Sequence, residues 1–107
     1  MPSYHKLVRD RIPEIIHQSG KECRTRVLAG EELLLHLRDK LQEETAEYLD
    51  ATSDQASLEE LADVVSVIEA LLSLHGADWT TLMKVKATKD KARGGFTRGI
   101  FLIDADD

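Results

Sequence analysis

The middle of the chain alternates apolar and polar positions with the period of an α-helix. One stripe with steps of three and four residues consists of Leu34, Leu37, Leu41, Glu44 and Tyr48. Such spacing is typical of the helix face that packs against a core. Glu44 is the only charged member of this stripe, so it interrupts an apolar seam rather than decorating a solvated surface.

The same periodicity, bounded by start and stop residues, predicts four helices. They cover residues 12–19, 31–51, 55–75 and a segment from about Asp78 to just before Gly94. Pro13 suits the first turn of the short helix, which Gly20 ends. Ser53 or Asp54 is expected to cap the second long helix, and Gly76 to end it.

Two short segments, residues 23–28 and 96–103, are rich in β-branched and apolar side chains and are expected to pair as a small β element. The predicted fold is therefore an all-α bundle of about four helices, two of them long, with this small β element. A length of 107 residues corresponds to a single domain, residues 1–107. The helix over 55–75 is apolar on more than one side, which predicts that a homodimer or higher oligomer completes the bundle.

Acidic residues recur at helical spacing in both long helices, as Glu43-Glu44-x-x-Glu47 and Glu60-x-x-Asp63. Positions three apart share a helix face. If the two helices pack antiparallel, four carboxylates converge on one small volume, where they cannot all stay ionised without a cation. Oxygen ligands suit Mg²⁺, which commonly shares its coordination with water and substrate phosphates.

A solvated face stabilised by ion pairs within the helix is the ordinary explanation of such acids. It accounts well for Glu31, Glu32 and Glu59, and poorly for Glu44 and Asp63, which lie among apolar positions.

Charge and cysteine content narrow the class of protein. A net charge of −6 argues against a nucleic-acid-coating protein. The lone Cys23 excludes an internal disulfide and a thiolate metal site, which favours a reducing, cytoplasmic setting. We expect no signal peptide and no membrane contact, because the most apolar stretch, residues 61–74, is too short to cross a bilayer.

Three sequence blocks in the same order resemble the MazG-like all-α nucleoside triphosphate pyrophosphohydrolases. The first is the acid motif Glu43-Glu44-x-x-Glu47 with Glu60-Leu61-Ala62-Asp63. The others are His5-Lys6-Leu7-Val8-Arg9-Asp10-Arg11-Ile12-Pro13 and Arg93-Gly94-Gly95-Phe96. These flanking blocks are similar to a branch described as predicted house-cleaning pyrophosphatases, with relatives once labelled phosphoribosyl-ATP pyrophosphohydrolase-like.

The resemblance implies a dimeric helical bundle that cleaves a nucleoside triphosphate to monophosphate and pyrophosphate with the help of Mg²⁺ or Mn²⁺. In house-cleaning enzymes the triphosphate is a non-canonical one. The family's metal-binding acids match Glu44, Glu47, Glu60 and Asp63. Glu43 matches a more variable position. The catalytic acids are expected among Glu43, Glu44 and Glu47, and the match does not say which one activates water.

A triphosphate also requires cations near the acids. Lys86, Lys89 and Arg93 lie on one face of the last helix, and Arg93 could fork onto two phosphate oxygens. Lysines near a helix C-terminus also stabilise its dipole without any ligand. Lys6 and Arg9, in the N-terminal block, are further candidates for phosphate binding. That block could equally be a structural strap held by ion pairs of Asp10.

Three other functions stay open. The same architecture hydrolyses phosphoribosyl-ATP in histidine biosynthesis, and a non-catalytic helical module could retain the acids for metal binding or pairing. A di-iron protein is less well matched, because Glu14-x-x-His17 is one Glu-x-x-His pair where such a site needs two.

Overall fold

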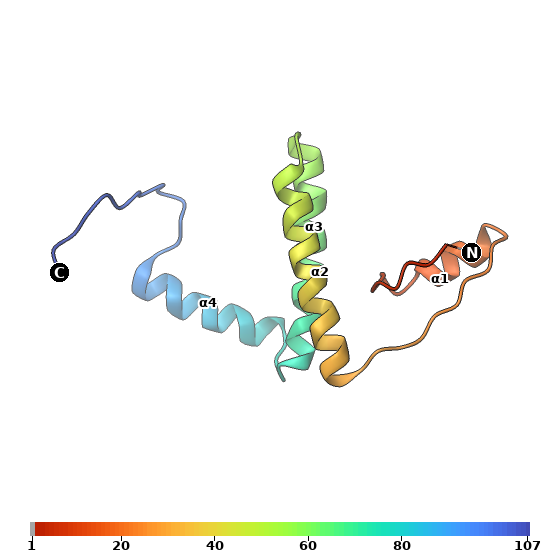
Figure 1. Ribbon diagram of the computed structural model, residues 1–107. Helices are drawn as coiled ribbons and strands as arrows, with labels where there is room; N and C mark the ends of the chain where they lie inside the picture. Colours follow the sequence, from red (N-terminus) through yellow and green to blue (C-terminus); the bar gives the residue numbers. More distant parts are fainter. Residues whose placement is uncertain (1) are drawn as a thin grey trace.

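A computed structural model describes residues 2–107 and contains only helices as regular structure (Figure 1). The helices are α1 (Ile12–Gln18), α2 (Gly30–Asp50), α3 (Asp54–Leu74) and α4 (Trp79–Arg93). Each begins and ends within one residue of its predicted bounds, so the all-α prediction is confirmed. Within the described residues, no helix has the length and apolarity needed to cross a membrane.

An antiparallel hairpin of α2 and α3 forms the centre of the molecule (Figure 1). Residues 51–53 connect the two helices, with Ala51 in an extended conformation. Ser53 rather than Asp54 is the N-cap of α3, because its hydroxyl oxygen accepts a hydrogen bond from the Ala56 amide at 3.1 Å. This cap satisfies one of the backbone donors that every helix start leaves free, and it fixes where α3 begins.

The turn from α3 into α4 is set by Gly76 and Asp78. Gly76 has a φ of 67°, which permits the Ala77 amide to donate to the Leu72 carbonyl at 2.9 Å, as in a Schellman motif. Asp78 then caps α4 by accepting from the Thr81 amide at 2.8 Å. As a result α4 extends away from the hairpin instead of packing along it (Figure 1).

The hydrophobic core of the single chain is small. Only Leu37 on α2 and Val67 on α3 are buried apolar side chains among the described residues, at 4% and 8% exposure. The radius of gyration is 18.3 Å, whereas a compact domain of this size has about 13 Å. Large apolar side chains in α4 and the C-terminal segment stay exposed, Val85 and Phe101 among them.

The predicted β element is not present: neither residues 23–28 nor residues 96–103 form a strand. The reason is topological. The segment before α2 lies on one side of the hairpin, while α4 carries the C-terminal segment to the opposite side (Figure 1). The two segments therefore cannot pair within one chain.

Candidate metal centre

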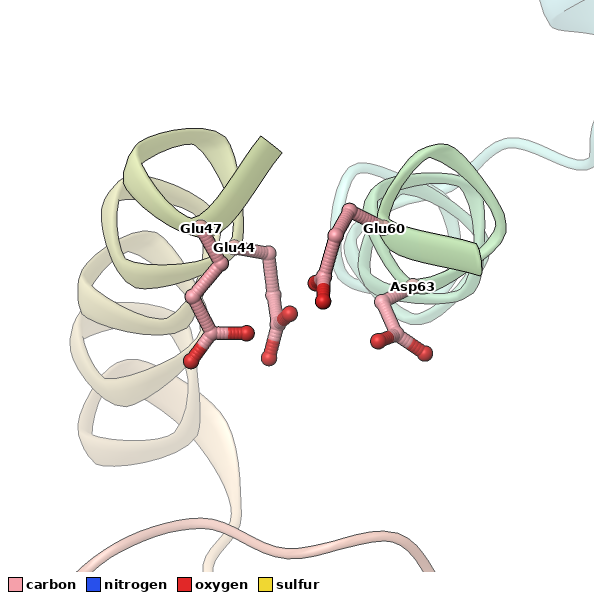
Figure 2. Close-up of side chains that lie close together, drawn as sticks. All are labelled: Glu44, Glu47, Glu60 and Asp63. Carbon is pink, nitrogen blue, oxygen red and sulfur yellow. The ribbon is translucent and has the colours of Figure 1, made fainter. Parts of the chain in front are cut away.

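The four predicted acids converge between α2 and α3. Figure 2 shows Glu44 and Glu47 projecting from α2 toward Glu60 and Asp63 on α3. One oxygen from each carboxylate can be chosen so that all of them lie within 4.8 Å of one another. The convergence follows from the hairpin, because the spacing of three residues places both acids of each helix on the face that meets the other helix.

Glu44 is the most buried member of this acid cluster, with 6% of its surface exposed. Its Oε2 atom and the Oε2 atom of Glu60 are both buried and have no hydrogen-bond partner within residues 2–107. A buried carboxylate oxygen without a partner is costly, because it has lost water and gained nothing. These two unpartnered oxygens are an observation independent of the clustering itself, and both fit a bound cation.

The electrostatics of Glu44 are those of an incompletely neutralised site. Burial raises the pKa of Glu44, and the neighbouring Glu47 raises this pKa further through hydrogen bonding and like charge. Lys40 opposes both effects, because its Nζ lies 3.4 Å from Glu44 Oε1. The acid cluster thus holds negative charge that one lysine only partly offsets.

These donors fit a hard divalent cation. All four groups are carboxylates, they come from two long helices, and two of their oxygens lack a hydrogen-bond partner among the described residues. Oxygen-only donor sets of this kind suit Mg²⁺, Mn²⁺ or Ca²⁺ rather than zinc or copper.

Glu43 lies outside the acid cluster. Its Oε2 atom accepts from Lys40 Nζ at 3.4 Å, and its side chain is 42% exposed. Glu43 and Glu44 therefore share Lys40 from two sides, and Glu43 is positioned to influence the site through that lysine rather than as a direct ligand.

The N-terminal segment brings Arg9 to the acid cluster. Arg9 Nη2 lies 2.5 Å from Asp63 Oδ1 and donates to Ser66 Oγ at 3.2 Å. By contrast, Asp10 forms no salt bridge within residues 2–107. The segment is therefore anchored through Arg9, not through Asp10 as one alternative from the sequence had it.

A cleft of about 590 Å³ lies between this N-terminal segment and the hairpin. Its apolar lining consists of Leu7, Val8, Ile12, Leu33, Leu37, Val67 and Ala70. Its polar lining consists of Lys6, Arg9, Asp10, Lys40, Glu44, Asp63, Ser66 and Glu69. Glu44 and Asp63 belong to both the cleft and the acid cluster, so the two are continuous.

Sequence reasoning missed three features of this region: Lys40, Ser66 and the cleft itself. The spacing of four between Lys40 and Glu44 was an available signal for the first. No comparable signal pointed to Ser66 or the cleft, because both depend on the path of the N-terminal segment.

The basic residues predicted on the last helix do not reach the acid cluster of the same chain. Lys86, Lys89 and Arg93 belong to α4, which extends away from the hairpin (Figure 1), and none of them lines the cleft. Lys86 instead pairs with Asp90 on the same helix at 2.6 Å. Within one chain, the cations at the site are Lys40, Arg9 and Lys6.

Comparison with known proteins adds one partial relative. The chain is 46% identical over 54 residues to a protein of Mycolicibacterium smegmatis described as uncharacterized. The matched region covers 50% of this chain and 55% of that protein, so the chain spans about half the length of the relative. No family model matches the chain. No solved structure matches it either.

Proposed function

We propose that this chain is a Mg²⁺-dependent nucleoside triphosphate pyrophosphohydrolase of the MazG-like kind, acting on a non-canonical triphosphate. Water would attack the α-phosphorus, and the bond between the α- and β-phosphates would break to release monophosphate and pyrophosphate. The observation that carries the proposal is the convergence of four carboxylates with two buried, unpartnered oxygens. The resemblance of the acid motif and of the flanking blocks supplies the reaction.

In this proposal Glu44, Glu47, Glu60 and Asp63 hold Mg²⁺, or Mn²⁺ in its place. When bound, the ion would neutralise charge on the triphosphate and lower the pKa of the attacking water. Lys40 partly offsets the negative charge of the buried Glu44. Glu47, the exposed acid of the set, is best placed to accept a proton from solvent-side water.

The cleft beside the acid cluster favours a nucleotide as the substrate over a small phosphorylated metabolite. Its apolar walls suit the nucleoside, and a metal ion held by Glu44 and Asp63, which also line the cleft, would bind the phosphates. Lys6 and Arg9 line the same cleft, so they could meet phosphate oxygens without a large movement of the chain.

We further propose that the working form is a homodimer or a higher oligomer. Within residues 2–107 only Leu37 and Val67 are buried apolar side chains, and large apolar side chains stay exposed on α4 and in the C-terminal segment. A second copy would cover these surfaces and could bring Lys86, Lys89 and Arg93 to the partner's site. A monomeric mass by light scattering at micromolar concentration would contradict this.

The decisive experiment is a hydrolysis screen of the purified protein with Mg²⁺ and product identification. The substrates are standard, oxidised, deaminated and methylated nucleoside triphosphates, together with phosphoribosyl-ATP. We expect monophosphate and pyrophosphate from one class of triphosphate, with the activity abolished in Glu44→Gln and retained in the matched surface variant Glu31→Gln. Diphosphate and orthophosphate would show that attack occurs elsewhere. Turnover of phosphoribosyl-ATP alone would assign the histidine-pathway reaction instead.

A non-catalytic metal-binding or interaction module is the second candidate, favoured by the exposed apolar surface of α4 and the C-terminal segment. It predicts bound Mg²⁺ and no turnover of any substrate. In that case Glu44→Gln would change metal affinity or oligomeric state and nothing else.

A further inference from the structure

Arg9 occupies the place of a cation at the acid cluster. Its guanidinium lies against Asp63 Oδ1 at 2.5 Å and against Ser66 Oγ at 3.2 Å, although Arg9 and Asp63 are 54 residues apart in the sequence. Asp63, which Figure 2 shows beside Glu60, is half-buried, and its Oδ1 atom is the one that meets Arg9 of the N-terminal segment. The carboxylate that a metal would share with Glu44, Glu47 and Glu60 is therefore already engaged.

The contact between Arg9 and Asp63 depends on the net charge of the acid cluster. Without a metal, the four carboxylates of the cluster are countered by the side chains of Lys40 and Arg9. A divalent cation on the same carboxylates removes the excess negative charge that draws the guanidinium inward. The Arg9 side chain is able to leave, because it is 59% exposed and its contacts with Asp63 and Ser66 are the only side-chain hydrogen bonds that hold it in the part of the chain that the structure describes.

The guanidinium has a second destination close by. Arg9 lines the cleft that is continuous with the acid cluster, so a triphosphate held at the acids would lie within its reach. A guanidinium prefers the paired oxygens of a phosphate, which it binds with two parallel hydrogen bonds, to a carboxylate that a metal has already claimed.

We propose that Arg9 competes with the metal for Asp63 in the unliganded protein and moves to the substrate phosphates when metal and nucleotide bind. This role of Arg9 rests on the proposed function and adds to it that metal and nucleotide bind together rather than the metal first. Arg9 lowers the affinity for free metal, raises the affinity for the metal–triphosphate complex, and so favours loading of both together. It acts as a positioning and phosphate-binding residue.

Two binding measurements on the full-length protein test this, neither of which requires turnover. The first is Mn²⁺ affinity by electron paramagnetic resonance, and the second is affinity for Mg²⁺–tripolyphosphate by calorimetry. Arg9→Gln should bind Mn²⁺ about 3- to 10-fold more tightly and Mg²⁺–tripolyphosphate at least about 10-fold more weakly. Arg11→Gln is the matched control, because Arg11 pairs with Glu14 at 3.0 Å, away from the acids, and both affinities should stay unchanged.

The opposite signs separate this proposal from a merely structural strap, whose loss would weaken both kinds of binding. Unchanged or weaker Mn²⁺ binding in Arg9→Gln would overturn the proposal. Ser66→Ala removes the other acceptor of Arg9 and should shift Mn²⁺ affinity in the same direction by a smaller factor, which keeps the test available if Arg9→Gln folds poorly. Glu44→Gln in the same titration tests the metal site by itself, because it should weaken Mn²⁺ binding whether or not Arg9 has the proposed role.

Discussion

Lys40 and Glu44 lie one turn apart on α2, with the Lys40 Nζ atom 3.4 Å from Glu44 Oε1. Both side chains are largely buried, at 20% and 8% exposure. Lys40 also reaches Glu43 on its other side. It is therefore an internal counter-charge to the acid cluster, and its spacing of four is what the helix offers for such a pair.

Removal of Lys40 should destabilise the metal-free protein. Lys40→Gln leaves the buried Glu44 beside the like charge of Glu47 without its lysine counter-charge, so the free energy of unfolding at neutral pH should fall by about 1–2 kcal/mol. Urea unfolding without divalent ions measures this. Arg26→Gln is the control, because Arg26 pairs with Glu32 on the exposed surface, and such pairs contribute about 0–1 kcal/mol. Equal losses in the two variants would contradict an internal role for Lys40.

The raised pKa of Glu44 sets the sign of a pH dependence. Since the folded protein holds the Glu44 proton more tightly than the unfolded chain does, stability is greater below the ordinary value of 4.5 and declines as pH rises through the raised pKa. Glu44→Gln cannot ionise, so it should lose this decline and be more stable than the parent at neutral pH without metal. Urea unfolding between acid and neutral pH, compared with Glu31→Gln, checks the direction.

Substitutions of the two adjacent acids Glu59 and Glu60 on α3 should have very different effects on the metal affinity of the protein. Glu60 is a member of the acid cluster with a buried, unpartnered oxygen, whereas Glu59 accepts a hydrogen bond from Gln55 at the surface. Mutation of a residue that only supports a metal ligand commonly lowers metal affinity about 10- to 100-fold. Glu60 is proposed as a ligand itself, so Glu60→Gln should lower the affinity by about 100-fold, the upper end of that range. Glu59→Gln should cost nothing. Calorimetric titration with Mn²⁺ measures both, and similar affinities would move the site away from Glu60.

Leu37 should matter more for stability than any other leucine of α2. It is a buried residue of α2 with 4% exposure, so Leu37→Ala should lower the free energy of unfolding by about 2–5 kcal/mol. Leu35→Ala, at a position that is 55% exposed, should lie within about 0.5 kcal/mol of the parent in the single chain. A large effect at Leu35 would show that this face of α2 is covered in solution, as the proposed oligomer requires.

The hairpin and its acids could be predicted from the sequence because both depend on local periodicity. The step of three between Glu60 and Asp63, and between Glu44 and Glu47, fixes which face each carboxylate occupies once the helices form. A short connection between two long helices then requires them to lie antiparallel. Each of these inferences uses only residues that are close in sequence.

The rest depends on the direction in which segments leave the hairpin, which periodicity does not encode. Lys89 and Arg93 share a helix face in the sequence, but whether that face meets the acids is decided by the angle at Gly76 and Asp78. The contact between Arg9 and Asp63 was likewise invisible, because nothing near Arg9 in sequence specifies a partner on α3. Pairing of residues 23–28 with 96–103 was expected from composition alone, and the topology separates them.

The short connection over residues 51–53 has a consequence for how the site is made. All four acids fall between Glu44 and Asp63, so only a small loop has to close before they meet. Loop-closure entropy grows with length, and proteins rich in local contacts fold fastest. The acid cluster should therefore assemble early, with the first helical hairpin, while Arg9 and the cleft wall arrive later from the distant N-terminus. A nascent chain would be able to bind a divalent ion at these acids before the cleft beside them has formed.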